Sequence, residues 1–197
     1  LVGIPLVIFF HMRHTTPVER LTPTLRFWQQ VTPAPTDEAR FRRPPLSLLP
    51  LLQVLAVGAG SIGTAFARLM QALGSYTIGV RRTPGGAMDG FDEMHTFERL
   101  DALLPRADVV ALSLPETAQT VNLMDARRFS LLKEGSYFIN VGRGSAVDQE
   151  ALLEALSSGR LAGASIDVTT PEPLPADHPL WRQKNLLLTP HISGFYH

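Results

Sequence analysis

The 197-residue sequence contains no cysteine, which excludes disulfide bonds, thiol catalysis and cysteine-ligated metal sites. It has no excess of either charge, because Lys+Arg and Asp+Glu both total 18, so bulk charge favours neither a nucleic-acid nor a membrane partner. It also lacks a long apolar run. The opening stretch 1–10 contains Pro5, is too short to span a bilayer, and lacks the basic residues that begin a secretory signal.

What the sequence does contain is enough apolar material for a large core. Hydrophobic residues make up 45% and charged residues 18%, a balance that excludes wholesale disorder. We therefore expect a cytoplasmic α/β protein that has no nucleic-acid or membrane partner.

Glycine is nearly absent from the first fifty residues, which hold one of the fifteen glycines but eight of the sixteen prolines. This composition predicts a short helical or irregular N-terminal arm and linker at 1–50, followed by a folded domain at 51–197. The chain starts at Leu1 rather than Met and ends soon after a histidine of interest, so we expect a fragment of a longer protein.

From residue 53 onward, short apolar runs alternate with segments of helical periodicity. The apolar runs predict strands at 54–57, 76–80, 109–114, 137–141, 164–168 and 186–188. The periodic segments predict helices at 62–73, 97–104, 125–132 and 148–156. Several runs are apolar on both faces, as in a parallel sheet covered by helices. The alternation predicts a doubly wound α/β domain.

The residues at 58–63 form a G-x-G-x-x-G sequence directly after the first predicted strand and at the start of the first predicted helix. In this context the first glycine makes a tight turn, the second admits a pyrophosphate, and the third lets helix and strand pack closely. The helix N-terminus then offers free N–H groups and a positive dipole to the anion. We predict a dinucleotide-binding loop rather than a purely structural turn.

The residues that follow the second predicted strand select between the two nicotinamide cofactors. An acid at this position would bind the ribose 2′-hydroxyl of NAD, but the chain has Arg81, Arg82 and Thr83 instead. Guanidinium groups match the geometry of a phosphate, so we predict a preference for NADP(H), with NAD(H) as the alternative. A solvated basic turn would also account for these residues.

Three later segments place polar residues after predicted strands, where open α/β sheets bind their ligands. They are the segments 140–144 with Arg143, 167–174 with Glu172, and 189–194 with His191. Each alone is compatible with an ordinary surface residue.

Together with the glycine loop and the LPET sequence at 114–117, these segments resemble the nucleotide-binding domain of the D-isomer-specific 2-hydroxyacid dehydrogenases. That family includes glyoxylate/hydroxypyruvate reductases, phosphoglycerate dehydrogenases and D-lactate dehydrogenases. The resemblance covers residues 54–194 and implies a Rossmann domain whose companion substrate domain is largely absent from this chain. It also implies a homodimer, and the apolar stretch 1–10 would suit burial against a partner.

The resemblance assigns roles to individual residues. Arg143 would bind the substrate carboxylate and polarise its carbonyl, while Glu172 would pair with His191, the acid/base. Asp167 would face the nicotinamide carboxamide. The remaining residues that we expect at the cofactor are Gly58, Gly60, Ser61, Ile62, Gly63, Arg81, Arg82, Thr83, Pro115, Thr117, Val141, Gly142 and Gly194.

These residue types suit the reduction of a small 2-oxo acid such as glyoxylate or hydroxypyruvate. A histidine supplies the proton, a neighbouring carboxylate stabilises the imidazolium, and an arginine neutralises the substrate carboxylate. No metal is needed, because the cofactor carries the redox step. Two alternatives stay open: a non-catalytic NADP-binding module or inactive truncated paralogue, and a Rossmann dehydrogenase that acts on a different alcohol.

Overall fold

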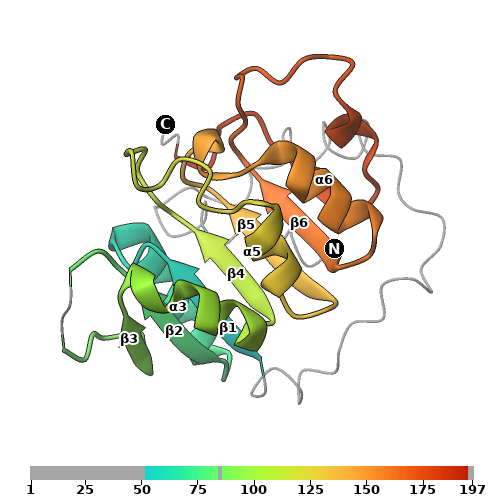
Figure 1. The fold of residues 1–197 in the computed structure, drawn as a ribbon. Coiled ribbons are helices and arrows are strands. Elements are labelled where there is room, and N and C mark those ends of the chain that lie inside the picture. The colour runs from blue at the N-terminus through green and yellow to red at the C-terminus, as the bar shows by residue number, and fades with distance from the viewer. Residues whose placement is uncertain (1–51, 84–85, 195–197) are drawn as a thin grey trace, which may run out of the picture. The chain divides into compact units, whose positions relative to one another are not determined.

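The computed structural model describes residues 52–83 and 86–194, which contain a seven-stranded sheet flanked by helices (Figure 1). The strands are β1 (Gln53–Val57), β2 (Tyr76–Val80), β3 (Glu93–His95), β4 (Val109–Leu112), β5 (Ser136–Asn140), β6 (Leu161–Ile166) and β7 (Leu186–Leu188). They are all parallel and lie in the order β3-β2-β1-β4-β5-β6-β7. This is the doubly wound Rossmann order, so the predicted fold class is confirmed. The predicted arm at 1–50 lies outside the described residues, and the domain boundary there stays a prediction.

The connections between the strands are helical. The α-helices are α3 (Ser61–Ala72), α4 (Leu100–Leu103), α5 (Ala126–Leu131) and α6 (Gln149–Ser157), and the 3₁₀ helices are η4 (Phe97–Arg99), η5 (Leu104–Arg106), η6 (Gly144–Ala146) and η7 (Pro179–Arg182). Helix α3 packs on β1 and β2, whereas α5 packs on η5 and α6. Right-handed crossovers place α3 on one face of the sheet and α4, α5 and α6 on the other. No helix within the described ranges is long and apolar enough to cross a membrane.

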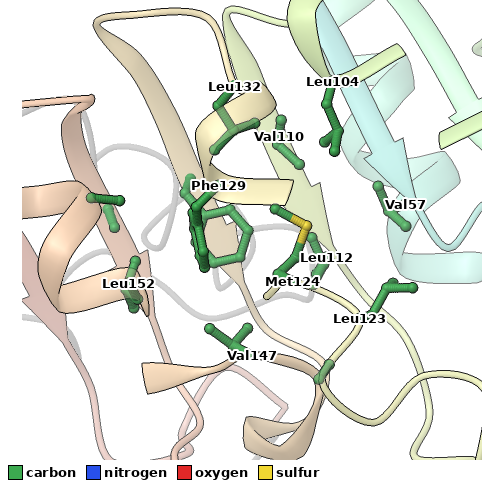
Figure 2. Packing of buried hydrophobic residues seen from close by; sticks show 14 of the residues in the cluster. Val57, Leu104, Val110, Leu112, Leu123, Met124, Phe129, Leu132, Val147 and Leu152 are labelled. Atoms are coloured by element: carbon green, nitrogen blue, oxygen red, sulfur yellow. The ribbon is translucent and has the colours of Figure 1, made fainter. Parts of the chain in front are cut away.

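The main core lies between the sheet and the α4–α6 face. Figure 2 shows Phe129, Met124 and Leu132 gathered around Val110 and Leu112 of β4, and all five side chains are buried. Phe129 also meets Phe138 of β5 edge to face, with ring centroids 5.3 Å apart. Each side chain of this size contributes roughly 1.5–3 kcal/mol when it is fully buried. Burial on both faces explains why the strands appear in the sequence as continuous apolar runs.

The structure differs from the predicted elements at two places. Strand β3 was not predicted, because it is a three-residue edge strand with the polar sequence EMH and has no apolar run. The helix predicted at 97–104 is instead the series η4, α4 and η5, with Pro105 inside the last turn. Proline has no N–H to continue the α-helical ladder, which accounts for the break. The strands predicted at 76–80 and 186–188 match β2 and β7, and the other boundaries differ by at most three residues.

The sheet topology decides where a ligand can bind. The carboxyl ends of all seven strands meet at one edge, and the direction of the connections reverses between β1 and β4. Open α/β sheets bind ligands in the crevice outside such a reversal. The segments that follow β1, β4, β5, β6 and β7 therefore converge on one site.

A polar network joins the edge strand β3 to the rest of the domain. Glu93 accepts two hydrogen bonds from Arg106, at 2.7 and 3.1 Å, and one from the Tyr76 hydroxyl at 2.9 Å. Its other contact is with His95 Nε2 at 2.8 Å. The hydrogen bonds from Arg106, followed by that of His95, lower the pKa of Glu93 from 4.5 to about 2. The ionised carboxylate thus fastens β3 to η5 and β2.

Replacing Glu93 by Gln should lower the free energy of unfolding by about 1–3 kcal/mol at neutral pH. The pKa of Glu93 is depressed in the folded state, so its contribution is present above the unfolded pKa and is lost as the pH falls from about 4.5 towards 2. Urea unfolding of both proteins should show the difference at about pH 7 and a smaller one at about pH 3. Glu134→Gln, at an exposed side chain without a hydrogen bond among the described residues, is the control. A pH-independent difference would contradict this account.

Candidate active site

The glycine loop after β1 packs directly against the end of β4. A side-chain Cβ on Gly58 would lie 2.8 Å from the Ser113 carbonyl oxygen, and one on Gly63 would lie 2.1 Å from the Gly58 carbonyl oxygen. Gly58 also has φ +105°, a conformation that favours glycine. Ser113 Oγ donates to the Gly58 carbonyl at 2.9 Å, which holds the turn in place. Gly58 and Gly63 are therefore required by close packing within the protein.

Gly60 differs from its two neighbours in the motif, because a Cβ at this position would meet no protein atom within 4 Å. It is the N-cap of α3, and no side chain caps the helix. Within the described part of the chain, the backbone N–H groups of Ser61 and Ile62 have no acceptor, and both residues are exposed. Protein packing does not require glycine here, whereas the close approach of an anionic ligand does. The loop fits a pyrophosphate at an uncapped helix N-terminus.

Arg81 lies at the end of β2, where a nucleotide-binding domain contacts the ribose. Its backbone N–H donates to the His95 carbonyl at 3.1 Å, and its Nη1 lies 3.7 Å from the Met88 sulfur. Arg81 Nε is buried and has no hydrogen-bond partner among the described residues. Arg82 and Thr83 follow in an exposed bend. The guanidinium of Arg81 is thus held near the carboxyl edge without a carboxylate partner in the described ranges.

The segment after β4 forms a hydrogen-bonded turn that contains two of the predicted cofactor residues. Thr120 Oγ1 donates to the Pro115 carbonyl at 2.8 Å and accepts from the Thr117 N–H at 2.8 Å. Thr117 Oγ1 lies 3.1 Å from Thr120 Oγ1. Pro115 and Thr117 are both exposed, and they follow Ser113 and Leu114, which contact Gly58 of the glycine loop.

The segment after β5 is shaped by the buried side chain of Asn140, for which we predicted no role of its own. Its amide accepts from the Gly142 N–H and donates to the Arg143 carbonyl, both at 3.0 Å. A Cβ on Gly142 would lie 2.6 Å from the Leu114 nitrogen, and one on Gly144 would lie 2.1 Å from the Thr169 carbonyl oxygen. The turn between Val141 and Gly144 is therefore held by the Asn140 side chain and by close contacts with the backbone of Leu114 and Thr169.

Arg143 lies at the apex of that turn with an exposed side chain. Its Nη1 donates to the Gly142 carbonyl at 2.7 Å. No carboxylate among the described residues pairs with it. An exposed guanidinium with free donors is suited to bind a planar carboxylate.

Asp167 organises the segments after β6 and β7, and it is 3% exposed. Its carboxylate accepts from the Ile192 N–H at 3.0 Å and the Ser193 N–H at 2.9 Å, and also from the Thr189 hydroxyl. Its backbone carbonyl accepts from the His191 N–H at 2.8 Å. One buried aspartate thus binds four groups of the loop that carries the histidine.

His191 and Glu172 form a pair across two loops. His191 Nδ1 lies 2.8 Å from Glu172 Oε1, and both side chains are about two-fifths exposed. The backbone of His191 has φ +54°, a conformation that costs of order 1–3 kcal/mol for a residue other than glycine. The hydrogen bonds to Asp167 hold this conformation. His191 Nε2 has no hydrogen-bond partner in the described part of the chain, so it is free to exchange a proton with a ligand.

The sequence-predicted residues thus lie at one edge of the sheet but do not all touch one another. Glu172 contacts His191, and the glycine loop contacts the end of β4, whereas Arg143 belongs to the neighbouring turn. Gly194 is exposed, and a Cβ there would meet no atom within 4 Å. The described ranges contain no cluster of three or more metal-ligating side chains. We predicted no role for the supporting residues Ser113 and Asn140, whose side chains bond to backbone groups.

Comparison with known families agrees with this geometry. Residues 25–193 match the family model of the D-isomer specific 2-hydroxyacid dehydrogenase, NAD binding domain. A D-3-phosphoglycerate dehydrogenase of Escherichia coli K12 is 42% identical over 146 residues, which cover 70% of this chain and 34% of that protein. A glyoxylate/hydroxypyruvate reductase A of Salmonella typhi is 37% identical over 138 residues, which cover 70% of this chain and 44% of that protein. The chain thus spans less than half of the length of either relative.

A solved structure extends the similarity to three dimensions. The D-isomer specific 2-hydroxyacid dehydrogenase from Xanthobacter autotrophicus Py2, in complex with NADPH and MES, is 34% identical and has a TM-score of 0.75. The match covers 98% of this chain and 74% of that one.

Replacing Asp167 by Asn should lower the free energy of unfolding by roughly 2–4 kcal/mol, because the amide puts an NH₂ group where a buried loop N–H needs an acceptor. Urea unfolding measures the change. The control is Asp177→Asn, at an exposed carboxylate without a hydrogen bond in the described part of the chain. Equal losses in the two variants would show that Asp167 does not hold the loop.

Proposed function

Because the chain belongs to the NAD-binding domain family of the D-isomer-specific 2-hydroxyacid dehydrogenases, we propose that it serves hydride transfer between a nicotinamide cofactor and a small 2-oxo or 2-hydroxy acid. The observation that supports this most directly is the His191–Glu172 pair, at 2.8 Å, at the same sheet edge as Arg143, which has no carboxylate partner among the described residues. Together they offer a proton donor and an anion-binding group without a metal.

The residues that would hold the cofactor are distributed along the carboxyl edge. The uncapped N-terminus of α3 and Gly60 would bind the pyrophosphate. The turn with Pro115 and Thr117 and the segment from Val141 to Gly142 would line the path towards the nicotinamide, which Asp167 and Gly194 would adjoin. When bound, the cofactor supplies the hydride to the carbonyl carbon of a 2-oxo acid, or accepts it in the reverse direction.

His191 would donate the proton that the resulting alkoxide needs. With Nδ1–H donating to the Glu172 carboxylate, Nε2 is the nitrogen that holds or releases the catalytic proton. The carboxylate would fix the orientation of the ring through this hydrogen bond. Arg143 would bind the substrate carboxylate and neutralise charge that develops on the neighbouring oxygen.

We propose that NADP(H) is preferred over NAD(H). The basis is Arg81, with its buried unpaired Nε and without an acid at the ribose position, together with Arg82 and Thr83. The solved relative from Xanthobacter autotrophicus was crystallised with NADPH. This cofactor suits reduction, and we propose a substrate of the size of glyoxylate or hydroxypyruvate.

The proposal includes a homodimer in the cytoplasm, with a small 2-oxo or 2-hydroxy acid as the ligand and without a nucleic-acid or membrane partner. Family resemblance supports the dimer, and the balanced charge of the sequence supports the exclusion of nucleic acid. The apolar stretch 1–10 that would suit a dimer contact lies outside the described residues.

NADPH should bind the purified chain at least tenfold more tightly than NADH, which corresponds to about 1.4 kcal/mol. The double variant Arg81→Ala/Arg82→Ala should lose that preference while it keeps its affinity for NADH, because only the 2′-phosphate contacts are removed. Calorimetric titration measures both affinities, and Arg99→Ala, at an exposed arginine of η4, is the control. Equal affinities in the parent chain would overturn the preference for NADP(H) but not the dehydrogenase assignment.

His191→Ala should reduce the turnover of glyoxylate with NADPH by about 100-fold or more, because the proton donor is lost. Its affinity for NADPH should hardly change, and His178→Ala should keep turnover. The loss of reduced-nicotinamide absorbance follows the reaction. A His191→Ala variant with a near-normal rate would refute the role of His191. A parent chain that binds NADPH but reduces no small 2-oxo acid would favour the non-catalytic module.

A further inference from the structure

Glu172 lies on a segment that has little regular support. Residues 170–174 belong to no helix or strand, and Thr170, Pro171, Glu172 and Pro173 are all exposed. Thr169, the residue just before this segment, donates from its Oγ1 to the Pro171 carbonyl at 3.0 Å. We call residues 170–174 the Glu172 arm. The bond of Glu172 to His191 and the buried side chain of Leu174 attach this arm to the domain, and a further attachment is required to hold its backbone near Glu172.

That attachment comes from Gln149. Its Oε1 accepts from the Thr170 N–H at 2.9 Å, and its Nε2 donates to the Thr170 carbonyl at 2.8 Å. One side-chain amide therefore satisfies both backbone groups of a single residue, two positions before Glu172. Within the described ranges, the only other side chain from outside residues 170–174 that bonds to the backbone of residues 170–173 is that of the adjacent Thr169.

Gln149 is itself well anchored, because it is the first residue of α6. Asp148 caps this helix by accepting from the Glu150 and Ala151 N–H groups, both at 3.1 Å, and its own N–H donates to the Met124 carbonyl at 3.0 Å. Leu152, one turn further along α6, is fully buried in the main core. The amide of Gln149 thus links the Glu172 arm to a capped helix that packs into the main core.

We propose that Gln149 is a positioning residue, which holds Glu172 at hydrogen-bond distance from His191 through its two-point bond to Thr170. The inference rests on the proposed function, since the orientation of His191 matters for catalysis. Small displacements of a catalytic group can lower a rate by up to about 100-fold, so loss of the bond should act on the chemical step. It should leave cofactor and substrate binding nearly unchanged, because Gln149 bonds to neither the glycine loop nor Arg143.

The test compares Gln149→Ala and Gln149→Glu with the parent chain. Gln149→Ala should lower kcat about tenfold, with KM for glyoxylate and the affinity for NADPH nearly constant. Gln149→Glu keeps an acceptor for the Thr170 N–H but has no donor for the Thr170 carbonyl. Its kcat should therefore lie between those of the parent chain and Gln149→Ala. Gln183→Ala is the matched control, because Gln183 donates at 2.9 Å to Ser157, which lies outside the arm.

NMR measurements on the same proteins follow the arm without any need for turnover. In Gln149→Ala, the Thr170 amide should exchange with solvent about tenfold faster, and the order parameter of the Glu172 amide should fall. A parent chain without turnover would refute the proposed function, and the order parameter would still decide whether Gln149 positions Glu172. An unchanged order parameter, or a kcat for Gln149→Ala equal to that of Gln183→Ala, would overturn the inference.

Discussion

The carboxylate of Asp167 is the interaction on which the candidate site depends. It is buried at the end of β6, and with its backbone carbonyl it binds four groups of the loop that follows β7. A buried carboxylate without such donors would be strongly unfavourable, so loop and aspartate stabilise one another. The same bonds hold His191 at φ +54° and direct its ring towards Glu172. The structure shows that the carboxylate of Asp167 bonds to this loop, and the contact with the nicotinamide that the family resemblance implies stays a prediction.

The parallel sheet brings this loop to the same edge as the other candidate site residues. Its strands are parallel, so the loops after β1, β4, β5, β6 and β7 end at one edge, and each is supported by a different device. Ser113 holds the glycine loop, Asn140 holds the Arg143 turn, and Gln149 holds the Glu172 arm. Arg143 is exposed and the His191–Glu172 pair is partly exposed, while the side chains that position them are bonded to backbone. Such support is what a preorganised site requires.

Much of the fold could be predicted from the sequence, because buried parallel strands leave continuous apolar runs and the glycine loop has a fixed spacing from β1. The edge strand β3 could not be predicted, since its sequence EMH has no apolar pattern. It is attached through the bond between Arg106 and Glu93, which are 13 residues apart and meet only in the folded chain. The candidate residues Arg143, Glu172 and His191 were predicted from segments that resemble a family. Supporting residues such as Gln149 were not predicted, because they bond to backbone groups. Every residue has such groups, so the sequence does not show which of them a side chain will contact.

The most direct test is a crystal structure of the chain grown with NADPH. The account predicts the pyrophosphate at the N-terminus of α3, the 2′-phosphate beside Arg81 and Arg82, and the nicotinamide at the edge that carries His191. Such a structure would show the Asp167 loop unchanged, since its bonds form without a ligand. Binding of NADPH with its nicotinamide directed away from His191, or at another edge of the sheet, would contradict the account.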